Sequence, residues 1–245
     1  LPRALVAPGV SVASVADVST YGLLTGVEQE QKRAKMLEAF SRMYGPAIGT
    51  GPVMEYLGQT GQDALKGADM LRVAPEQYTS TVEYASTPIA QKLRDIAMVH
   101  IAGLGSRIFY CDHGSFDTHA AQATEHSRLW VEAAAAIRDF WDDLREHESD
   151  GNVIMLLFSE FGRRVRDNGS GTDHGAAGVA FVIGPSVKGG MYSVYPDTRA
   201  EALQQGDLVP NLDFRGLYST VLEQWMGLDP APIVNGQFEQ PNFLR

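Results

Sequence analysis

The sequence has little cysteine, and this scarcity narrows the possible chemistry. Cys111 is its one cysteine, so an intramolecular disulfide framework and a cysteine-rich zinc site are excluded. Cys111 stands in an apolar stretch predicted to be a strand, where a lone cysteine packs as a small hydrophobic residue. It has no electropositive context to activate it, so we do not expect it to act as a nucleophile.

Long apolar runs and an amino-terminal leader are also missing. No run approaches the roughly 18 apolar residues of a membrane-spanning helix, and no basic, apolar, small-residue leader opens the sequence. We therefore expect no transmembrane segment. The sequence starts at Leu1, within a pattern typical of a loop and a short strand. This start predicts that a longer chain was processed or truncated.

Positive charge is in the minority. With 20 basic and 30 acidic residues, the formal net charge is -10, which repels polyanions and argues against nucleic acid as a partner. The excess of carboxylates suits divalent cations, although a solvated acidic surface has the same composition. A length of 245 residues with 44% hydrophobic residues is enough for one large α/β domain with a sizeable core.

Residues 28–103 carry three helical patterns in succession. Apolar residues recur every three or four positions over 28–44, a second pattern covers 52–71, and Pro88 opens a third. We predict a mainly helical insertion over 28–103 that shapes access to a site. Residues 1–27 have no clear period and predict the start of a core segment or a linker.

Strands and helices alternate over 104–230. We predict strands at 108–111, 153–158 and 179–183, and helices at 118–147 and 214–226. The uninterrupted apolar run at 153–158 predicts a central parallel strand covered on both faces. The pattern indicates a layered α/β core followed by a C-terminal tail at 231–245. So few strands in so long a chain predict an incomplete domain.

Polar clusters fall beside the predicted strands. They are Asp112–His119, Ser159–Arg164 and Asn168–Gly175. Ligand sites in open α/β sheets lie beyond the carboxyl ends of the strands. We therefore expect these clusters to converge at one rim of the sheet.

The first cluster offers a carboxylate and an imidazole for one divalent cation. Asp117 and His119 lie just before a predicted helix, and both could reach one Zn²⁺ or similar ion. Alternatively, Asp117 or Thr118 caps the helix and His119 forms a hydrogen bond within its first turn. His113, beside Asp112, is a further candidate ligand.

The second cluster offers a carboxylate and two guanidinium groups. Glu160 directly follows a predicted buried strand, where a carboxylate needs a partner. The partner is either a metal ion or one of the neighbouring Arg163 and Arg164 side chains, as a structural ion pair.

The third cluster is rich in glycine. Gly169, Gly171 and Gly175 flank Asp173 and His174, and glycine allows tight turns and close approach of the backbone to a ligand. A plain turn can contain the same glycines. If His174 binds metal, we expect Asp173 to be an alternative ligand or to orient His174 through its other ring nitrogen.

Taken together, these motifs resemble the bacterial family catalogued as domain of unknown function 1501. The resemblance covers about residues 88 to 230 and is weaker before them. Its motifs are Phe116–His119 followed by Gln122, Ser159–Arg164, Gly171–Gly175, Val187–Gly190, and Asp213–Arg215 with Tyr218 and Trp225 in the following helix.

This family is grouped with the alkaline phosphatase-like and sulfatase-like superfamily, whose members bind one or two divalent metals and act on phosphate or sulfate esters. The resemblance implies a layered sheet flanked by helices. It also implies zinc, or alternatively calcium, magnesium or manganese, bound by Asp117, His119, Glu160 and His174. Arg163, Arg164 and Lys188 are the candidates for holding an anionic group, because arginine binds such groups with two hydrogen bonds.

The sequence departs from the superfamily pattern in two respects. The second metal site usually has Asp-His after a strand, whereas this chain has Glu160-Phe161. The superfamily's first metal-binding aspartate and its nucleophile lie in an amino-terminal half that the chain is expected to lack, so no nucleophile is assigned. That half or a second copy of the chain is an expected partner. Family members carry a twin-arginine export signal, which implies a periplasmic or extracellular location.

Two functions follow from the resemblance. The first is an exported metal-dependent hydrolase whose substrate is a small anionic ester or an exported polymer. The second is a non-catalytic extracellular binding or assembly protein that retains the hydrolase fold, and the incomplete site favours it. Fold-level resemblance alone does not choose between them.

Overall fold

The computed structural model describes residues 12–18, 21, 30–47 and 49–245, so most of the segment 1–27 lies outside the described residues. The chain forms two compact units. The first contains the described residues up to His113 together with Glu132–His147, and the second contains Gly114–Val131 together with Glu148–Arg245. These bounds differ from the domain bounds expected from the sequence, because the long helix α5 contributes to both units.

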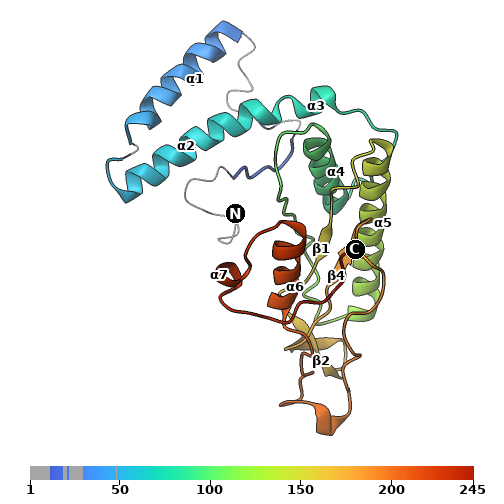
Figure 1. The fold of residues 1–245 in the computed structure, drawn as a ribbon. Helices are drawn as coiled ribbons and strands as arrows, with labels where there is room; N and C mark the ends of the chain where they lie inside the picture. The colour runs from blue at the N-terminus through green and yellow to red at the C-terminus, as the bar shows by residue number, and fades with distance from the viewer. Residues whose placement is uncertain (1–11, 19–20, 22–29, 48) are drawn as a thin grey trace. The chain divides into compact units, whose positions relative to one another are not determined.

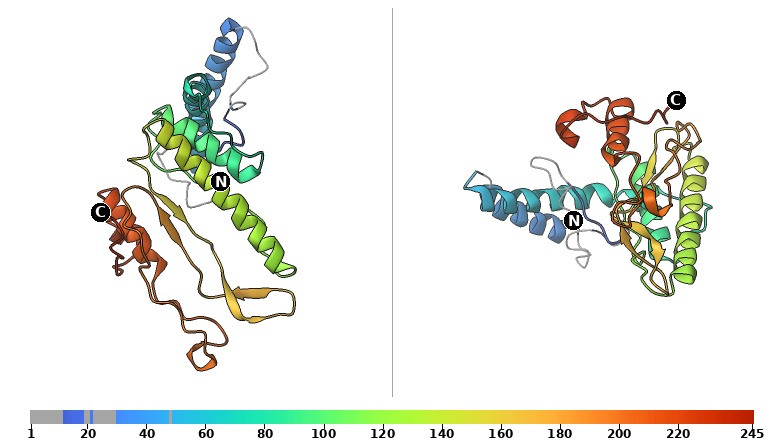
Figure 2. Two further views of the ribbon diagram at one scale, coloured as in Figure 1. Left: turned by 90° about the vertical axis from the view of Figure 1, so that its right-hand side faces the viewer. Right: turned by 90° about the horizontal axis from the view of Figure 1, so that it is seen from below.

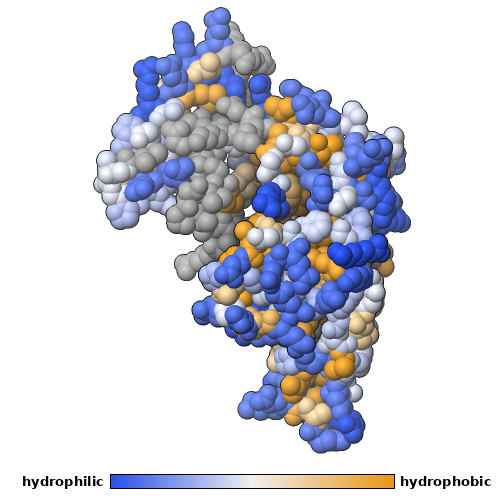
Figure 3. Space-filling view, viewed as in Figure 1, coloured by the Kyte–Doolittle hydropathy of each residue, from blue (hydrophilic) through white to orange (hydrophobic). Residues whose placement is uncertain are grey.

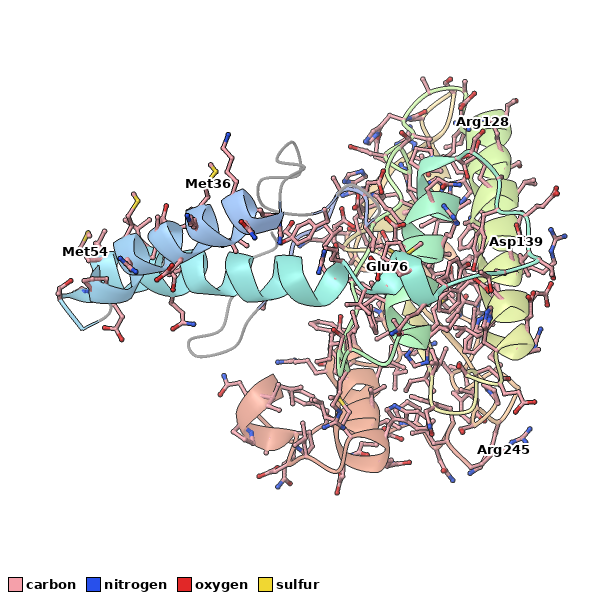
Figure 4. All side chains as sticks on the ribbon, turned by 90° about the horizontal axis from the view of Figure 1, so that it is seen from above. Met36, Met54, Glu76, Arg128, Asp139 and Arg245 are labelled. Atoms are coloured by element: carbon pink, nitrogen blue, oxygen red, sulfur yellow. The ribbon has the colours of Figure 1, made fainter. Side chains whose placement is uncertain are left out.

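Helices dominate the first unit. They are α1 (Glu30–Tyr44), the short helix η2 (Gly45–Ala47), α2 (Pro52–Leu71), α3 (Ala74–Gln77), α4 (Pro88–Ile101) and the second part of α5 (Gln122–Glu146). The three predicted helical patterns are confirmed in the described residues. Helices α1 and α2 pack against each other as a hairpin (Figure 1). Met36 of α1 and Met54 of α2 are exposed on this hairpin (Figure 4).

Local signals set the bounds of α4. Pro88 occupies the start of the helix, where its missing N–H group has no intrahelical partner in any case. Gly103 follows the helix with a φ of 65°, which glycine adopts without a steric penalty. Met98 and Val99 of this helix join the core of the first unit, which also contains Leu71, Ala74, Tyr78 and Val18.

Helix α5 buries one stripe of its surface. The buried residues Leu129, Ala133, Ala136, Phe140 and Leu144 recur at intervals of three or four, as expected for an amphipathic helix. The predicted helix began at residue 118, but α5 begins at Gln122. This start is displaced because Ala121 has a φ of 51°, which a right-handed helix cannot contain.

A long antiparallel ribbon forms the sheet structure of the second unit. Strand β1 (Met155–Leu157) pairs with β4 (Phe181–Ile183), and β2 (Gly162–Asp167) pairs with β3 (Thr172–Gly175). The pairings are nested, so the chain runs out through β1 and β2 and returns through β3 and β4 (Figure 2). Each sheet has two strands. The molecule is therefore a mixed α and β protein with small sheets.

Two strand predictions are wrong. The central parallel strand at 153–158 is instead a short antiparallel strand, because its partner returns locally through a hairpin. Residues 108–111 form no strand. There Ile108 is 67% and Tyr110 51% exposed, while Phe109 packs against the core of the first unit. The apolar run thus alternates between solvent and core rather than entering a sheet.

The core of the second unit joins the ribbon to the end of the chain. Helix α6 (Phe214–Thr220) continues into a wider π-helical turn, η4 (Val221–Trp225). Leu217 packs with Phe243 and Leu244, and apolar residues of β1 and β4 cover them. The predicted tail at 231–245 therefore contains α7 (Ala231–Val234) and two core residues.

The segment between β4 and α6 is more open. It contains the short helix η3 (Ala200–Ala202). Met191, Val194 and Tyr195 expose 74%, 73% and 81% of their surface, and apolar side chains are visible among hydrophilic ones in the space-filling view (Figure 3). In the described part of the chain, no helix combines the length and apolar character needed to cross a bilayer.

Candidate metal centre

Two segments of the second unit bring a carboxylate and two imidazoles together. Asp117 and His119 lie in the loop before α5, and His174 lies in β3. One potential ligand atom from each side chain lies within 4.8 Å of the other two. Three of the four predicted ligands therefore converge, and they form a possible metal-binding triad.

The carboxylate lies between the two imidazoles. Asp117 Oδ1 is 2.9 Å from His119 Nε2 and 2.6 Å from His174 Nε2. The hydrogen bond with His174 and the nearby His119 hold the pKa of Asp117 below its usual value. An ionised carboxylate only accepts hydrogen bonds. Asp117 Oδ1 therefore requires protons or a metal cation between it and the two histidine nitrogens.

The geometry of the triad is compatible with a shared divalent cation. Zinc ligands lie about 2.0–2.1 Å from the ion in a tetrahedron, which places ligand atoms about 3.3 Å apart. The separations of 2.6 and 2.9 Å from Asp117 are within about 1 Å of that value, and the potential ligand atoms of the two histidines lie within 4.8 Å of each other. Imidazole and carboxylate groups are common ligands of divalent metal cations.

Asp173 is placed beside His119 rather than beside His174. Asp173 Oδ1 is 3.2 Å from His119 Nδ1. Hydrogen bonds from Asn168 and then from His119 lower the pKa of Asp173. The expectation that Asp173 orients His174 is therefore wrong, because adjacent side chains of a strand point to opposite faces. The pairing leaves His119 Nε2 directed toward Asp117.

The third cluster is a hairpin and not an extended loop. Only residues 168–171 turn, because Thr172–Gly175 belongs to β3. Asn168 Oδ1 accepts hydrogen bonds from the backbone N–H groups of Ser170 and Gly171, at 3.0 and 2.8 Å. A Cβ at Gly171 would lie 3.0 Å from the carbonyl oxygen of His119. Glycine there allows the turn to approach the loop that carries two of the ligands.

The same hairpin turn covers the start of α5. The N–H of Ala121 donates to Ser170 Oγ at 2.9 Å, and the N–H of Gln122 donates to the Ser170 carbonyl oxygen at 3.2 Å. The alternative in which Asp117 caps this helix is therefore wrong. Asp117 keeps its carboxylate for the two histidines.

Arg163 fastens the ligand loop to the ribbon. Its guanidinium donates to the carbonyl oxygens of Thr172 and Phe116, both at 2.6 Å. It also lies over the ring of Phe161, which stacks on His174 with 4.0 Å between centroids and 9° between planes. Arg163 therefore holds the backbone on one side of the triad, and Phe161 fixes the plane of the His174 ring.

The other two candidates for anion binding contact distant parts of the second unit. Arg164 lies 3.6 Å from Asp207 and donates to the carbonyl oxygen of Gln205 at 3.4 Å. Lys188 donates to Asn242 at 3.0 Å. These contacts tie loops together, so none of the three predicted cationic residues is assigned to the triad.

Besides Asp173, the candidate ligands Glu160 and His113 lie outside the triad. Glu160 is exposed in the bend after β1, and it is not a member of the group found among the described residues. His113 belongs to the first unit, where it lies 3.9 Å from Glu132. The expectation that Glu160 joins Asp117, His119 and His174 in one group is therefore wrong.

The residue patterns did not predict that Asn168, Arg163 and Gln122 support the triad. Thr172 Oγ1 donates to Gln122 Oε1 at 2.9 Å, which is a further tie between β3 and α5. One signal was present in the sequence. Asn168-Gly169 is a dipeptide that favours tight hairpin turns, and it lies between the segments that became β2 and β3.

Comparison with known sequences finds one family. The sequence model of the family described as "Protein of unknown function (DUF1501)" matches residues 27–242. The match covers all three residues of the triad. No curated protein and no solved structure matches the chain.

Proposed function

Because the chain belongs to the DUF1501 family of proteins of unknown function, we propose a function from its triad: a divalent-metal-dependent, hydrolase-like protein acting on phosphate or sulfate esters. The observation that carries the proposal is the placement of Asp117 Oδ1 within hydrogen-bonding distance of Nε2 of both His119 and His174. Zinc is the proposed metal, since two imidazoles and one carboxylate are typical zinc ligands.

The exposure of the triad supports a role beyond folding. The side chains of Asp117, His119 and His174 are 63%, 47% and 42% exposed, and exposed ion pairs contribute little to stability. Three exposed groups that converge without a large gain in stability are better explained by a ligand that they share. An exposed site also leaves room for a substrate.

Each residue has a distinct task in this proposal. Asp117 supplies the negative charge that a divalent cation needs, His119 and His174 supply neutral nitrogen ligands, and Phe161 fixes the His174 ring by stacking on it. A bound divalent cation would supply Lewis-acid chemistry, which polarises an ester oxygen. Arg163 would act indirectly, because it holds the ligand loop and the ribbon together.

Substrate class, fold family and location depend on the sequence resemblance. The alkaline phosphatase-like and sulfatase-like superfamily supports phosphate and sulfate esters as substrates, and it supports a periplasmic or extracellular location. The mixed α and β fold is compatible with a member of that superfamily.

Metal analysis and enzyme assays test the proposal. We expect the chain to retain about one zinc ion after dialysis and His174→Ala to lose it, because a site with two remaining ligands is weak. His113→Ala is the matched control, since this histidine lies in the other unit beside Glu132, and it should retain the metal. Hydrolysis of aryl phosphate or sulfate esters by the zinc form, lost in His174→Ala, would support the enzyme. An absence of zinc binding by the wild-type chain would contradict the metal site.

A second function is favoured by the surroundings of the triad. Arg163, Arg164 and Lys188 are the residues predicted to hold an anion, and each donates hydrogen bonds within the protein. This arrangement supports a non-catalytic binding or assembly protein that retains a structural cation. Zinc binding without turnover of any ester in the panel would favour this second function.

A further inference from the structure

The side chain of Asn168 links the hairpin turn to the triad. Its Oδ1 atom accepts two backbone N–H groups of the turn, from Ser170 and Gly171. Its Nδ2 atom donates to Asp173 Oδ1 at 3.1 Å and to the carbonyl oxygen of His119 at 3.2 Å. Only this orientation of the amide gives every donor an acceptor, so the two ends of Asn168 have separate tasks.

Asp173, held in this way, determines the tautomer of His119. A carboxylate accepts hydrogen bonds and cannot donate them, so the nitrogen beside Asp173 must carry the proton. That nitrogen is His119 Nδ1, at 3.2 Å. When a cation takes the place of a proton between His119 Nε2 and Asp117, the lone pair of the neutral imidazole is therefore on Nε2, the atom that lies 2.9 Å from Asp117 Oδ1.

We propose that Asn168 is a positioning residue of the metal centre, because it holds Asp173 against His119 Nδ1 and thereby directs the lone pair of His119 Nε2 toward the metal. This inference builds on the proposed function. Histidine ligands of metals commonly donate their other N–H to a carboxylate, and loss of such a partner lowers metal affinity by about 10- to 100-fold. Asn168 does not contact the metal-binding atoms itself. It holds the Asp173 carboxylate and the His119 backbone together.

The substitution Asn168→Asp separates the two tasks. It keeps an oxygen acceptor for the N–H groups of the turn, but it replaces the donor that faces Asp173 with a second carboxylate oxygen. The matched control is Asn152→Asp, because Asn152 is an exposed residue of the same unit and the charge changes equally. Asp173→Asn is a second test variant, since it keeps an acceptor for Asn168 and for His119 but removes the charge.

The experiment has two readouts on the full 245-residue chain. The first is the ¹⁵N-coupled Nδ1–H signal of His119 in the NMR spectrum of the metal-free protein. The second is zinc affinity, measured by competition with a chelator. We expect Asn168→Asp to lose the His119 Nδ1–H signal and to bind zinc about 10- to 100-fold more weakly. Asn152→Asp should match the wild type, and Asp173→Asn should fall between the two.

The outcomes separate the inference from the proposed function. If Asn168→Asp keeps both the signal and the affinity of Asn152→Asp, the inference is wrong. If the wild-type chain binds no zinc, the proposed function fails. The NMR readout then decides the inference alone, because a signal present in wild type and lost in Asn168→Asp supports it and a signal absent from wild type overturns it. If Asn168→Asp does not fold, Asp173→Ala decides, because it removes the acceptor shared by Asn168 Nδ2 and His119 Nδ1. Unchanged affinity and signal in that variant would overturn the inference.

Discussion

The two units each place a carboxylate beside histidine, and the two surroundings are opposite in character. In the first unit, Asp143 is 0% exposed and accepts hydrogen bonds from the hydroxyl groups of Tyr78 at 2.5 Å and Tyr84 at 2.8 Å. His147 Nδ1 lies 3.2 Å from the same carboxylate. In the second unit, the side chain of Asp117 is 63% exposed and faces two histidine nitrogens.

The buried cluster is explained by folding. A buried carboxylate must be hydrogen-bonded, and Tyr78 and Tyr84 supply these bonds from the segment between α3 and α4. Burial and the neighbouring Asp143 raise the pKa of both tyrosines, which keeps them protonated as donors. The network therefore fastens this segment to α5.

Folding does not explain the exposed cluster in the same way. Its side chains are exposed to water, so their polar atoms would form hydrogen bonds with water if the side chains separated. They are brought together by the backbone contacts of the hairpin turn and of Arg163. We infer that burial, rather than residue type, distinguishes the structural carboxylate–histidine cluster from the candidate functional one.

Loss of Asp143 should have the largest effect. Asp143→Ala would leave two tyrosine hydroxyls buried without their acceptor, so we expect the free energy of unfolding to fall by about 3–5 kcal/mol. Asp142→Ala is the matched control, since Asp142 is its exposed neighbour on α5 and pairs with Arg145. The control should change stability by less than about 0.5 kcal/mol. Urea unfolding followed by circular dichroism measures both variants, and equal effects would contradict the comparison.

Gly171→Ala should have a smaller effect, located in the second unit. A Cβ there would lie 2.9 Å from Gln122 Cβ and 3.0 Å from the His119 carbonyl oxygen, so the turn must move away from the ligand loop. We expect destabilisation by about 1–3 kcal/mol together with weaker zinc binding in a chelator competition. Gly189→Ala is the control, because nothing lies within 4 Å of a Cβ at that position. Unchanged zinc affinity in Gly171→Ala would show that the turn does not hold the triad.

A pH effect is expected in the first unit. His147 Nδ1 and Nε2 each lie 2.8 Å from a carbonyl oxygen, of Asp143 and Thr79 respectively. Because carbonyl groups only accept hydrogen bonds, both nitrogens can donate only in the charged imidazolium. The hydrogen bond to the Asp143 backbone is the largest cause of the raised pKa of His147, and the charges of Asp143 and Glu146 add to it.

The direction of the pH effect follows from linkage. A folded-state pKa above the unfolded value means that the stabilisation is fully present below the unfolded pKa and is lost as pH rises through the folded pKa. We therefore expect the free energy of unfolding to be larger at about pH 6 than at about pH 8.5, and His147→Gln to reduce this difference. NMR titration of His147 measures its pKa directly. An identical pH profile in His147→Gln would contradict the assignment.

The helices were predictable because their signals are local. Helix α2 has the predicted bounds, 52–71, and α4 begins at the predicted Pro88. Apolar period, proline at the first turn and glycine after the last are all contained within the helix and its flanks. The start of α5 was missed because it depends on Ser170, a residue of the hairpin turn that is distant in sequence.

The strands were harder to predict because a strand is defined by its partner. The apolar run at 153–158 is compatible with a buried parallel strand or with one arm of a hairpin, and the hairpin forms. For the same reason, Asp117, His119 and His174 could be predicted as candidate ligands from their residue types and motif spacing, whereas Asn168 could not be predicted to lie beside them. Its role depends on where the turn meets the ligand loop, which no local pattern encodes.

The smallest effect is expected at Glu160, and it would sharpen the comparison most. Glu160 carries the same charge as Asp117 and was predicted as a ligand, but it is exposed in the bend after β1 and lies outside the triad. We expect Glu160→Gln to change zinc affinity by less than about twofold, since no ligand is removed, whereas Asp117→Asn should lower it by more than about 100-fold. Both substitutions remove one negative charge from an exposed carboxylate, so a general electrostatic effect would weaken binding equally. Chelator competition at two ionic strengths measures this, because a long-range charge effect is screened by salt and a lost ligand is not. A large loss of affinity in Glu160→Gln that persists at high salt would show that Glu160 binds the metal after all.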